Sequence, residues 1–386
     1  MKITEPLVHL INQSFLTGIV PVAMKVASIT PLFKAGCPKD VSNYRPISKL
    51  PCFSKILERA MHNRLTDFLE QNNVLYNKQF GFRKNHSTTF AIVEVVDKIS
   101  EAIDRRQMTV GVFLDLSKAF DTIRHEILWA KLDHYGIRGL ALDWFKSYLT
   151  DRTQQVCFAD TRSNLALIRC GVPQGSILGP LLFLLYINDI TNSTANLLFY
   201  LFADDTTVFI TGDRGCQLAS FMTKELMHLC TWFHANFLSL NPNKSCYIIF
   251  TGPRIIIPDD PNFEILIESY PIKRVSHVKF LGIILDEHLT WRKHIDLVHG
   301  KSAKMIGIMR RLKHALPSNT IRTLYNAFIL PYFSYGLIVW AGGYKTLLQP
   351  LLLLQKKVVR IIAGTHYLAH TASLFKDCSL LTITDL

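Results

Sequence analysis

The chain is 386 residues long and 49% hydrophobic, which is enough to bury an extensive core and longer than a usual single domain. Its net charge of +13 is unevenly distributed, because residues 291–386 contain 13 Lys and Arg against 3 Asp and Glu and so carry +10. Such a basic region indicates a polyanionic partner, most simply a nucleic acid, although a basic surface can also serve solubility. The most apolar run, 177–187, is too short for a membrane span and the first nine residues do not form a signal peptide, so we expect no membrane segment.

The eight cysteines are widely spaced and include no Cys-x-x-Cys pair. We therefore expect neither a disulfide framework nor a zinc ribbon, and a reducing compartment is favoured. His366, His370 and Cys378 could be considered as zinc ligands, but their partner ligands are missing, and scattered surface residues are the better interpretation.

Helical and strand-forming runs alternate through the first third of the chain. Ser54 is a plausible N-cap of one helix, and Ser87 or Thr88 of the next. The expected elements are a helix over 5–15, a strand over 27–33, a helix over 54–71 and a helix from 88 to about 106.

Two further strands end in aspartates. The buried-strand pattern TVGVFLDL (109–116) ends at Asp115, and LLFYLFADDTTVFI (197–210) predicts a β-hairpin with Asp204 and Asp205 at its tip. Asp is common in turns, so the pair alone is weak evidence, but a carboxylate leaving a buried strand must be hydrated, paired or bound to metal. If the strands are neighbours, Asp115 and Asp204 converge, and such oxygen ligands suit Mg²⁺. Because side chains alternate along a strand, we expect Asp204 and Asp205 to do unequal work.

Glycines and prolines divide the remaining sequence. The run GVPQGSILGP (171–180) predicts a loop whose glycines let backbone approach a ligand closely, with a glycine turn lacking a ligand as the alternative. The expected elements are helices within 126–149 broken near Gly136 and Gly139, a strand over 152–158, a helix ending near Asn188, a helix over 216–236, and helices over 294–311, 318–330, 332–340 and 347–362.

The segments FLDLSKAFD, GVPQGSILGP and FADD, in this order, resemble the palm of reverse transcriptases, most closely those of non-LTR (LINE-type) retrotransposons. The flanking segments agree with this resemblance: NYRPIS (43–48), QFGFRKNHST (79–88), LNPNKS (240–245) and VKFLGIILD (278–286). The resemblance extends from about residue 29 to 364. It implies an α+β fold of right-hand polymerase architecture, with an N-terminal extension (1–28), fingers (29–108), a palm that includes some fingers elements (109–290) and a helical thumb (291–386).

The resemblance also implies a chemistry for the acidic residues. Asp115, Asp204 and Asp205 would hold two Mg²⁺ ions, for which Mn²⁺ could substitute, and the primer 3′-hydroxyl would attack the α-phosphate of a deoxynucleotide. Lys244 lies where the family often has a lysine close to the triphosphate. It could protonate the leaving pyrophosphate, although a plain exposed lysine fits almost as well.

Further roles follow from the same resemblance. For the incoming nucleotide they are Lys34 and Arg45 on the triphosphate, Phe120 against the sugar and Gln174 near the base pair. Two surface cations and a core aromatic are the alternatives. For the RNA template and the DNA primer they are Arg83 and Lys84 in the fingers, together with Phe280 and Gly282 in a primer-supporting hairpin.

We therefore interpret the chain as an RNA-directed DNA polymerase of a LINE-type element, found in a cytoplasmic ribonucleoprotein or the nucleus. It begins almost at the polymerase and ends soon after the thumb, so we expect a fragment without the endonuclease. The alternatives are an inactive nucleic-acid-binding remnant and a maturase-like intron reverse transcriptase, which should carry a basic domain after the thumb.

Overall fold

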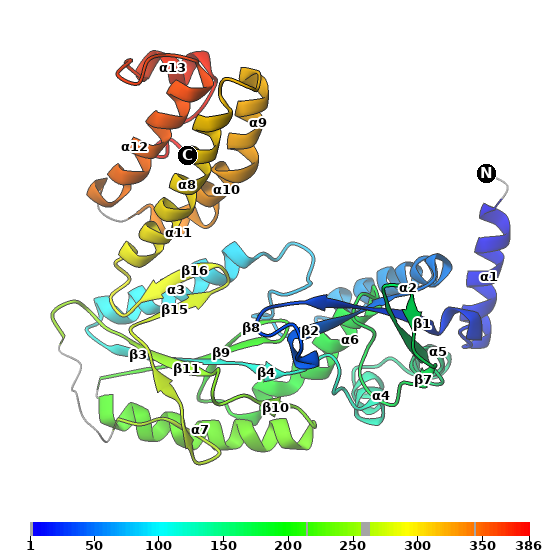
Figure 1. Ribbon diagram of the computed structural model, residues 1–386. Coiled ribbons are helices and arrows are strands. Elements are labelled where there is room, and N and C mark those ends of the chain that lie inside the picture. The colour runs from blue at the N-terminus through cyan, green and yellow to red at the C-terminus, as the bar shows by residue number, and fades with distance from the viewer. Residues whose placement is uncertain (1–2, 214, 256–262, 343–344) are drawn as a thin grey trace.

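The computed structural model describes residues 3–213, 215–255, 263–342 and 345–386. Three groups of elements are seen in Figure 1: a central sheet with helices on both faces, a second sheet with the N-terminal helices, and a helical bundle that projects from the central sheet. The N-terminus lies beyond the second sheet, on the side away from the central sheet, and the C-terminus lies in the bundle. The expected mixture of helices and antiparallel strands is confirmed. Within these ranges, no helix is both long enough and apolar enough to cross a lipid bilayer.

The central sheet has the strand order β14-β11-β3-β9-β8 and is antiparallel except for the β14–β11 pair. Its two faces follow from the alternation of side chains along each strand. Val110 and Val112 pack into one core together with α6 and α7, whereas Phe209 and Phe250 pack into another together with α3. Gly111 makes room for the Phe209 ring, which a Cβ at this position would approach to 2.6 Å. The elements are α3 (Thr88–Asp104), β3 (Met108–Leu114), α6 (Leu178–Ile187), η3 (Asn188–Ser193), β8 (Leu198–Phe202), β9 (Asp205–Gly212), α7 (Gly215–Ala235), β11 (Cys246–Phe250) and β14 (Lys273–Arg274).

The second sheet has the order β2-β1-β5-β6, with β7 also paired to β5. Helix α1 packs on α5, where the Trp144 Nε1–H donates a hydrogen bond of 2.9 Å to Ser14 Oγ and the Trp144 ring meets Phe15 edge-on. The elements are α1 (Thr4–Thr17), η1 (Val22–Met24), β1 (Val26–Phe33), η2 (Val41–Asn43), β2 (Tyr44–Lys49), α2 (Cys52–Gln71), α4 (His125–His134), α5 (Leu140–Leu149), β5 (Thr153–Phe158), β6 (Thr161–Arg162) and β7 (Ala166–Leu167).

Two predicted helix caps have different outcomes. Ser87 is confirmed as the N-cap of α3, since its Oγ accepts a hydrogen bond from the Phe90 N–H. The cap at Ser54 is wrong, because α2 already begins at Cys52, and the Ser54 hydroxyl is buried inside the helix, where it donates to Glu58 Oε1.

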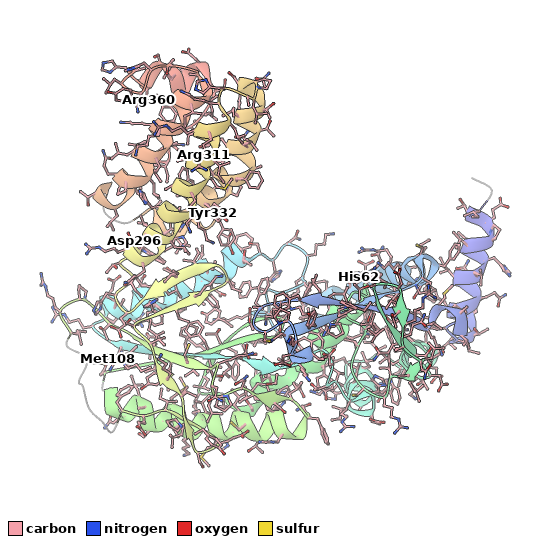
Figure 2. All side chains as sticks on the ribbon, in the orientation of Figure 1. His62, Met108, Asp296, Arg311, Tyr332 and Arg360 are labelled. Atoms are coloured by element: carbon pink, nitrogen blue, oxygen red, sulfur yellow. The ribbon has the colours of Figure 1, made fainter. Side chains whose placement is uncertain are left out.

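The C-terminal bundle follows a hairpin, β15–β16, that leads directly into α8. Figure 2 shows Arg311 and Arg360 on this bundle, as the uneven charge of the sequence predicts. The single helix expected over 332–340 is wrong, because Gly336 takes a left-handed φ of +61° and separates α10 from α11. The elements are β12 (Leu266–Ile267), β13 (Tyr270–Pro271), β15 (His277–Phe280), β16 (Ile283–Asp286), α8 (Arg292–Leu312), α9 (Ser318–Phe328), α10 (Leu330–Ser334), α11 (Leu337–Trp340), α12 (Lys345–Ile362) and α13 (Ala372–Asp377).

Candidate active site

The acidic residues meet at one end of the central sheet. Strand β9 pairs with β3 in an antiparallel register that ends at Leu114 opposite Thr206, so the next residues are Asp115 and Asp205. Strands β8 and β9 close with Phe202 opposite Asp205, which leaves Ala203 and Asp204 as the turn. The predicted hairpin and the predicted convergence of the two acidic strand ends are therefore confirmed.

The electrostatics of this end are those of crowded carboxylates. The pKa of Asp205 is raised to about 6, first by partial burial and then by the charges of Asp204 and Asp115. Burial also raises the pKa of Asp204, and Asp115 adds to this effect, whereas Arg45 and Lys34 oppose it. Both side chains still reach solvent. The two aspartates therefore differ in their surroundings, since the two cations act on Asp204.

Arg45 and Lys34 come from the neighbouring β1–β2 hairpin. Arg45 pairs with Leu32 in the strand register, and the Lys34 N–H donates to the Asn43 carbonyl (2.9 Å) just beyond the strand. Both side chains are exposed. The hairpin thus holds two exposed cations within electrostatic reach of Asp204.

Lys244 is placed beside Asp115 by a short ladder between β4 (Leu116–Ser117) and β10 (Ser239–Leu240). The Asn241 N–H donates to the Asp115 carbonyl (2.9 Å), and the Asp115 N–H donates to Ser245 Oγ (3.2 Å). The Lys244 Nζ lies 3.8 Å from Asp115 Oδ2, with 64% and 43% of the two side chains exposed. A pair this exposed adds little stability, so the lysine remains available to a ligand.

The loop that carries Gln174 is tied to the strand region after Asp115. Gln174 Nε2–H donates to Asp121 Oδ1 (2.8 Å), and the Ser48 N–H donates to the Gln174 carbonyl (2.7 Å). Partial burial raises the pKa of Asp121, while the hydrogen bond from Gln174 and the charge of Lys118 lower it. Asp121 is the last residue of the FLDLSKAFD segment, so its place in that motif is the signal in the sequence that points to it.

The glycines of this loop allow close approach to the protein's own backbone. A Cβ at Gly171 (φ +81°) would lie 2.8 Å from the Asp121 carbonyl oxygen, and one at Gly175 (φ +111°) would lie 2.8 Å from the Ser48 carbonyl oxygen. The glycine turn lacking a ligand, the alternative given above, accounts for both positions without a bound molecule.

Phe120 is half-buried at the base of the same region. Its ring centroid lies 4.6 Å from that of Phe183 on α6, and its carbonyl accepts a hydrogen bond from the Val172 N–H (2.9 Å). One part of the ring therefore belongs to the core and another part faces outward.

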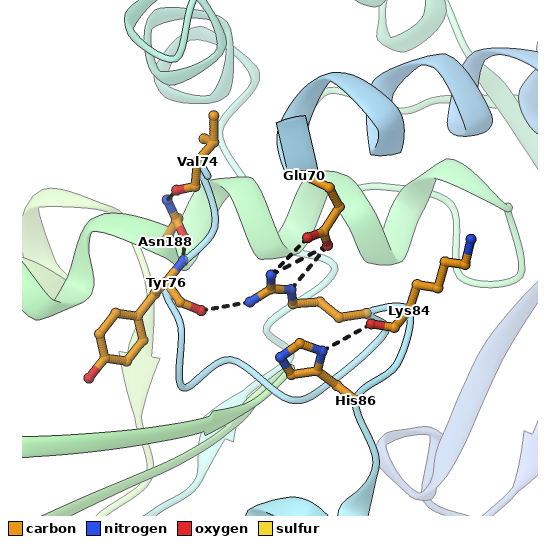
Figure 3. A network of polar contacts seen from close by, with 7 residues as sticks. Glu70, Val74, Tyr76, Lys84, His86 and Asn188 are labelled. Atoms are coloured by element: carbon orange, nitrogen blue, oxygen red, sulfur yellow. Dashed lines mark hydrogen bonds and ion pairs between the residues drawn. The ribbon is translucent and has the colours of Figure 1, made fainter. Parts of the chain in front are cut away.

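Figure 3 shows the network around Arg83 and Lys84. The Arg83 guanidinium donates to Glu70 Oε2 (3.1 Å) and to the Tyr76 carbonyl (3.0 Å), and only 9% of its side chain is exposed. The Lys84 side chain is exposed and points away from this network. Of the two residues, Lys84 alone presents its charge to solvent.

The hairpin that contains Phe280 and Gly282 is docked on the bundle. Phe280 is 5% exposed and its ring packs edge-on against Phe113, so the side chain is part of the core and is not free to touch a primer. Gly282 has a φ of +94°, and a Cβ there would lie 3.1 Å from the Tyr335 ring, while the Tyr335 hydroxyl donates to the Leu281 carbonyl. These contacts fix the hairpin against the helices that follow it.

Two other features lie outside this centre. A cavity of about 730 Å³ is lined by the 73–77 segment, α4 and η3, and none of the predicted site residues lines it. In the described ranges, no group of three or more His, Cys, Asp or Glu side chains is arranged to hold a metal ion. This holds for His366, His370 and Cys378, and also for Asp115, Asp204 and Asp205.

The comparisons with known proteins come from sequence and from structure. The family profile described as reverse transcriptase (RNA-dependent DNA polymerase) matches residues 37–285. The chain is 30% identical to the probable RNA-directed DNA polymerase from transposon X-element of Drosophila melanogaster over 95% of its length and 40% of that protein. It is also 30% identical to the RNA-directed DNA polymerase from mobile element jockey of the same species, over 97% of its length and 41% of that protein. The chain thus spans about two fifths of these relatives.

A solved structure of telomerase from Candida albicans, in complex with a TWJ fragment of telomeric RNA, superposes on this chain with a TM-score of 0.50 at 9% identity. The match covers 97% of this chain and 68% of that one. At this identity the likeness concerns the fold alone, and it confirms the expected right-hand polymerase fold.

Proposed function

The chain belongs to the reverse transcriptase family, among those of non-LTR retrotransposons, and from this premise we propose that it extends a DNA primer on an RNA template. The observation that carries the proposal is the meeting of Asp115 with the Asp204-Asp205 turn. In the proposed division, residues 1–28 are an extension, 29–108 form the fingers, 109–290 the palm and 291–386 the thumb.

The chemistry of the acidic residues fits divalent cations. Carboxylates are the hard oxygen ligands that Mg²⁺ prefers, and this ion takes only one or two of them, together with water and substrate phosphates. Partial burial, and then the charges of Asp204 and Asp115, raise the pKa of Asp205, so a bound cation would stabilise its charged form. When bound by Asp115, Asp204 and Asp205, Mg²⁺ or Mn²⁺ would supply charge neutralisation for the attacking primer hydroxyl and the leaving pyrophosphate.

The remaining residues would bind and orient the nucleotide. Arg45 can form paired hydrogen bonds with a phosphate and Lys34 can act as a point charge, and both already act on Asp204. Lys244, 3.8 Å from Asp115, would hold a proton near the pyrophosphate. The outward part of the Phe120 ring would meet the sugar, and Gln174 would lie beneath the base pair.

The template and primer would follow the exposed cations. Lys84 is exposed and would contact the template backbone, and the basic bundle, with the exposed Arg311 on α8, would follow the duplex. We leave Arg83 out of this surface because Glu70 and the Tyr76 carbonyl occupy its guanidinium. For the β15–β16 hairpin we propose support of the primer through its backbone at Gly282, since Phe280 is buried.

The proposal is tested by primer extension with the purified protein on an RNA template, using deoxynucleotides and Mg²⁺ or Mn²⁺. We expect template-dependent DNA products that terminate when one deoxynucleotide is omitted. Retained binding of the template–primer duplex without any product would instead support the inactive nucleic-acid-binding remnant.

A further inference from the structure

A buried glutamine lies directly behind the acidic turn. Gln79 is 2% exposed, and its Oε1 accepts hydrogen bonds from the Gly81 N–H (2.9 Å) and the Ala203 N–H (3.1 Å). Both neighbours are backbone donors, so the atom that faces them has to be the amide oxygen and not the nitrogen. Ala203 is itself buried, and among the described residues Gln79 Oε1 is the acceptor recorded for its N–H.

The turn that Gln79 contacts has an unfavourable backbone conformation. Ala203 has a φ of +55°, which places it in the left-handed region that residues with a Cβ avoid. Such a conformation persists only where its surroundings over-determine it. The hydrogen bond from Ala203 to Gln79 is one such constraint, and it acts on the residue that directly precedes Asp204.

The segment that carries Gln79 is held against the same hairpin by its backbone. The Phe80 N–H donates to the Leu201 carbonyl (2.8 Å), and the Leu201 N–H donates to the Lys78 carbonyl (3.0 Å). Gly81 then passes so close to the turn that a Cβ there would lie 2.5 Å from the Ala203 nitrogen. A distant part of the sequence is thus fixed on the outer edge of β8 and reaches the turn from behind.

We propose that Gln79 is a positioning residue that sets the conformation of the Ala203-Asp204 turn and, through it, the direction of the Asp204 and Asp205 carboxylates. Without the acceptor, the buried Ala203 N–H would be unpaired, and the turn would relax toward a negative φ at Ala203. That relaxation rotates the peptide before Asp204 and turns its side chain away from Asp115. The inference rests on the proposed function for its kinetic consequence, but the conformational consequence can be measured independently.

The main variant is Gln79→Met, which keeps the length of the side chain and removes the acceptor. Its matched control is Gln107→Met, because Gln107 donates to Asp213 at the opposite end of the β3–β9 ladder. Hydrogen–deuterium exchange of the Ala203 amide should accelerate by about tenfold or more in Gln79→Met, the effect of one lost buried hydrogen bond. Calorimetric titration of the metal-free protein with Mn²⁺ should show weaker binding by a similar factor. The control should change neither quantity.

A second change separates positioning from general loss of stability. Ala203→Gly removes the conformational penalty at a positive φ, so the turn no longer depends as strongly on its hydrogen bond. The double variant Gln79→Met/Ala203→Gly should therefore regain Mn²⁺ affinity, and kcat for primer extension, relative to Gln79→Met alone. The KM for deoxynucleotide should change less than kcat, because the triphosphate cations are untouched.

The outcomes decide the inference even if the chain makes no DNA, because exchange and Mn²⁺ binding need no activity. Equal exchange and equal Mn²⁺ affinity in Gln79→Met and Gln107→Met would overturn it. If Gln79→Met does not fold, Gln79→Glu keeps an acceptor for both N–H groups and should preserve protection of Ala203. Loss of that protection in a folded Gln79→Glu protein would also overturn it.

Discussion

Replacing Phe120 by Val separates a role in sugar selection from a role in packing. The Phe120 ring is half-buried and rests on Phe183, with 4.6 Å between centroids, so part of it stabilises the core. In the proposed function, the other part occupies the space that a 2′-hydroxyl of a ribonucleotide would need. The two roles predict different effects on the two classes of nucleotide.

The size of the packing effect can be estimated first. A fully buried Phe→Ala change costs about 3–5 kcal/mol, so a half-buried ring replaced by the larger Val should cost about 2 kcal/mol. Domains are commonly stable by about 5–15 kcal/mol, so the variant should stay folded. Loss of packing lowers activity on both nucleotide classes together. Loss of a steric barrier raises ribonucleotide incorporation relative to deoxynucleotide, and we expect about tenfold or more, equivalent to about 1.4 kcal/mol.

The assay compares kcat/KM for matched dNTP and rNTP on one RNA template. Phe183→Leu is the matched control, because it disturbs the same ring pair from the fully buried side without opening the site. We expect the ratio to change in Phe120→Val and to stay constant in Phe183→Leu. A constant ratio in both variants, with reduced total activity, would make Phe120 an ordinary core residue.

Three further predictions concern stability. Burial, and to a smaller extent the Lys301 charge, lowers the pKa of His294 to about 4, from a value near 6.5 in the unfolded chain. The free energy of unfolding should therefore be constant above pH 6.5 and should fall by up to about 3 kcal/mol as the pH drops toward 4, because only the unfolded chain takes up the proton in this range. Urea unfolding between pH 7 and 4.5 should show this slope, and a His294→Leu variant with the same slope would contradict it. The Ile177 N–H donates to the buried Glu58 Oε2 (2.7 Å), so Glu58→Ala removes its acceptor and should lower the free energy of unfolding by about 1–3 kcal/mol. Glu58→Gln keeps an acceptor oxygen and should lose less, and equal losses in the two variants would refute this. The raised pKa of Asp205 means that its negative charge destabilises the folded, metal-free protein. Asp205→Asn should therefore melt at a higher temperature than the parent above pH 6, and at the same temperature below about pH 4, where the carboxyl group is protonated in both states. A lower melting temperature of the variant at pH 7 would count against this.

The strands of the central sheet could be predicted because their residue types and their apolar patterns both favour the structure that they adopt. The hairpin around Ala203-Asp204 has strand-forming residues on both sides of a short polar break, and the run that ends at Asp115 is apolar throughout. Ordered motifs then placed the acidic residues in one site. The register between β3 and β9 is the structural fact that brings them together.

The supporting residues could not be predicted, because their partners are distant in the sequence. Gln79 bonds to a residue 124 positions away, and Glu58 reaches the N-terminus of α6 across 119 positions. Nothing in a local pattern distinguishes such buried polar residues from surface ones. Arg83 has a nearer partner, Glu70 on the preceding helix, but its spacing of 13 residues matches no helix or strand period, so the ion pair was equally hidden in the sequence.

The aromatic and helical misassignments have local causes. Phe280 lies beside an exposed turn in the sequence, yet its own strand position points into the core against Phe113. The helix expected over 332–340 contains Gly336, which has a left-handed φ of +61° and at which a Cβ would lie 2.3 Å from Ile283 Cδ1 on the β16 strand. Both errors arise where the β15–β16 hairpin packs against other elements, at β3 for Phe280 and at the bundle for Gly336, and sequence periodicity does not describe such contacts.

The central claim is that the carboxylates at the end of β3 and in the β8–β9 turn carry out DNA synthesis. The most direct test measures primer extension on an RNA template by Asp204→Asn, with Asp160→Asn, an exposed change in the β5–β6 turn, as the control. Affinity for the template–primer duplex is measured on the same proteins. The account predicts that Asp204→Asn binds the duplex like the parent and makes almost no DNA, while Asp160→Asn retains both properties. Primer extension by Asp204→Asn at the parental rate would contradict it.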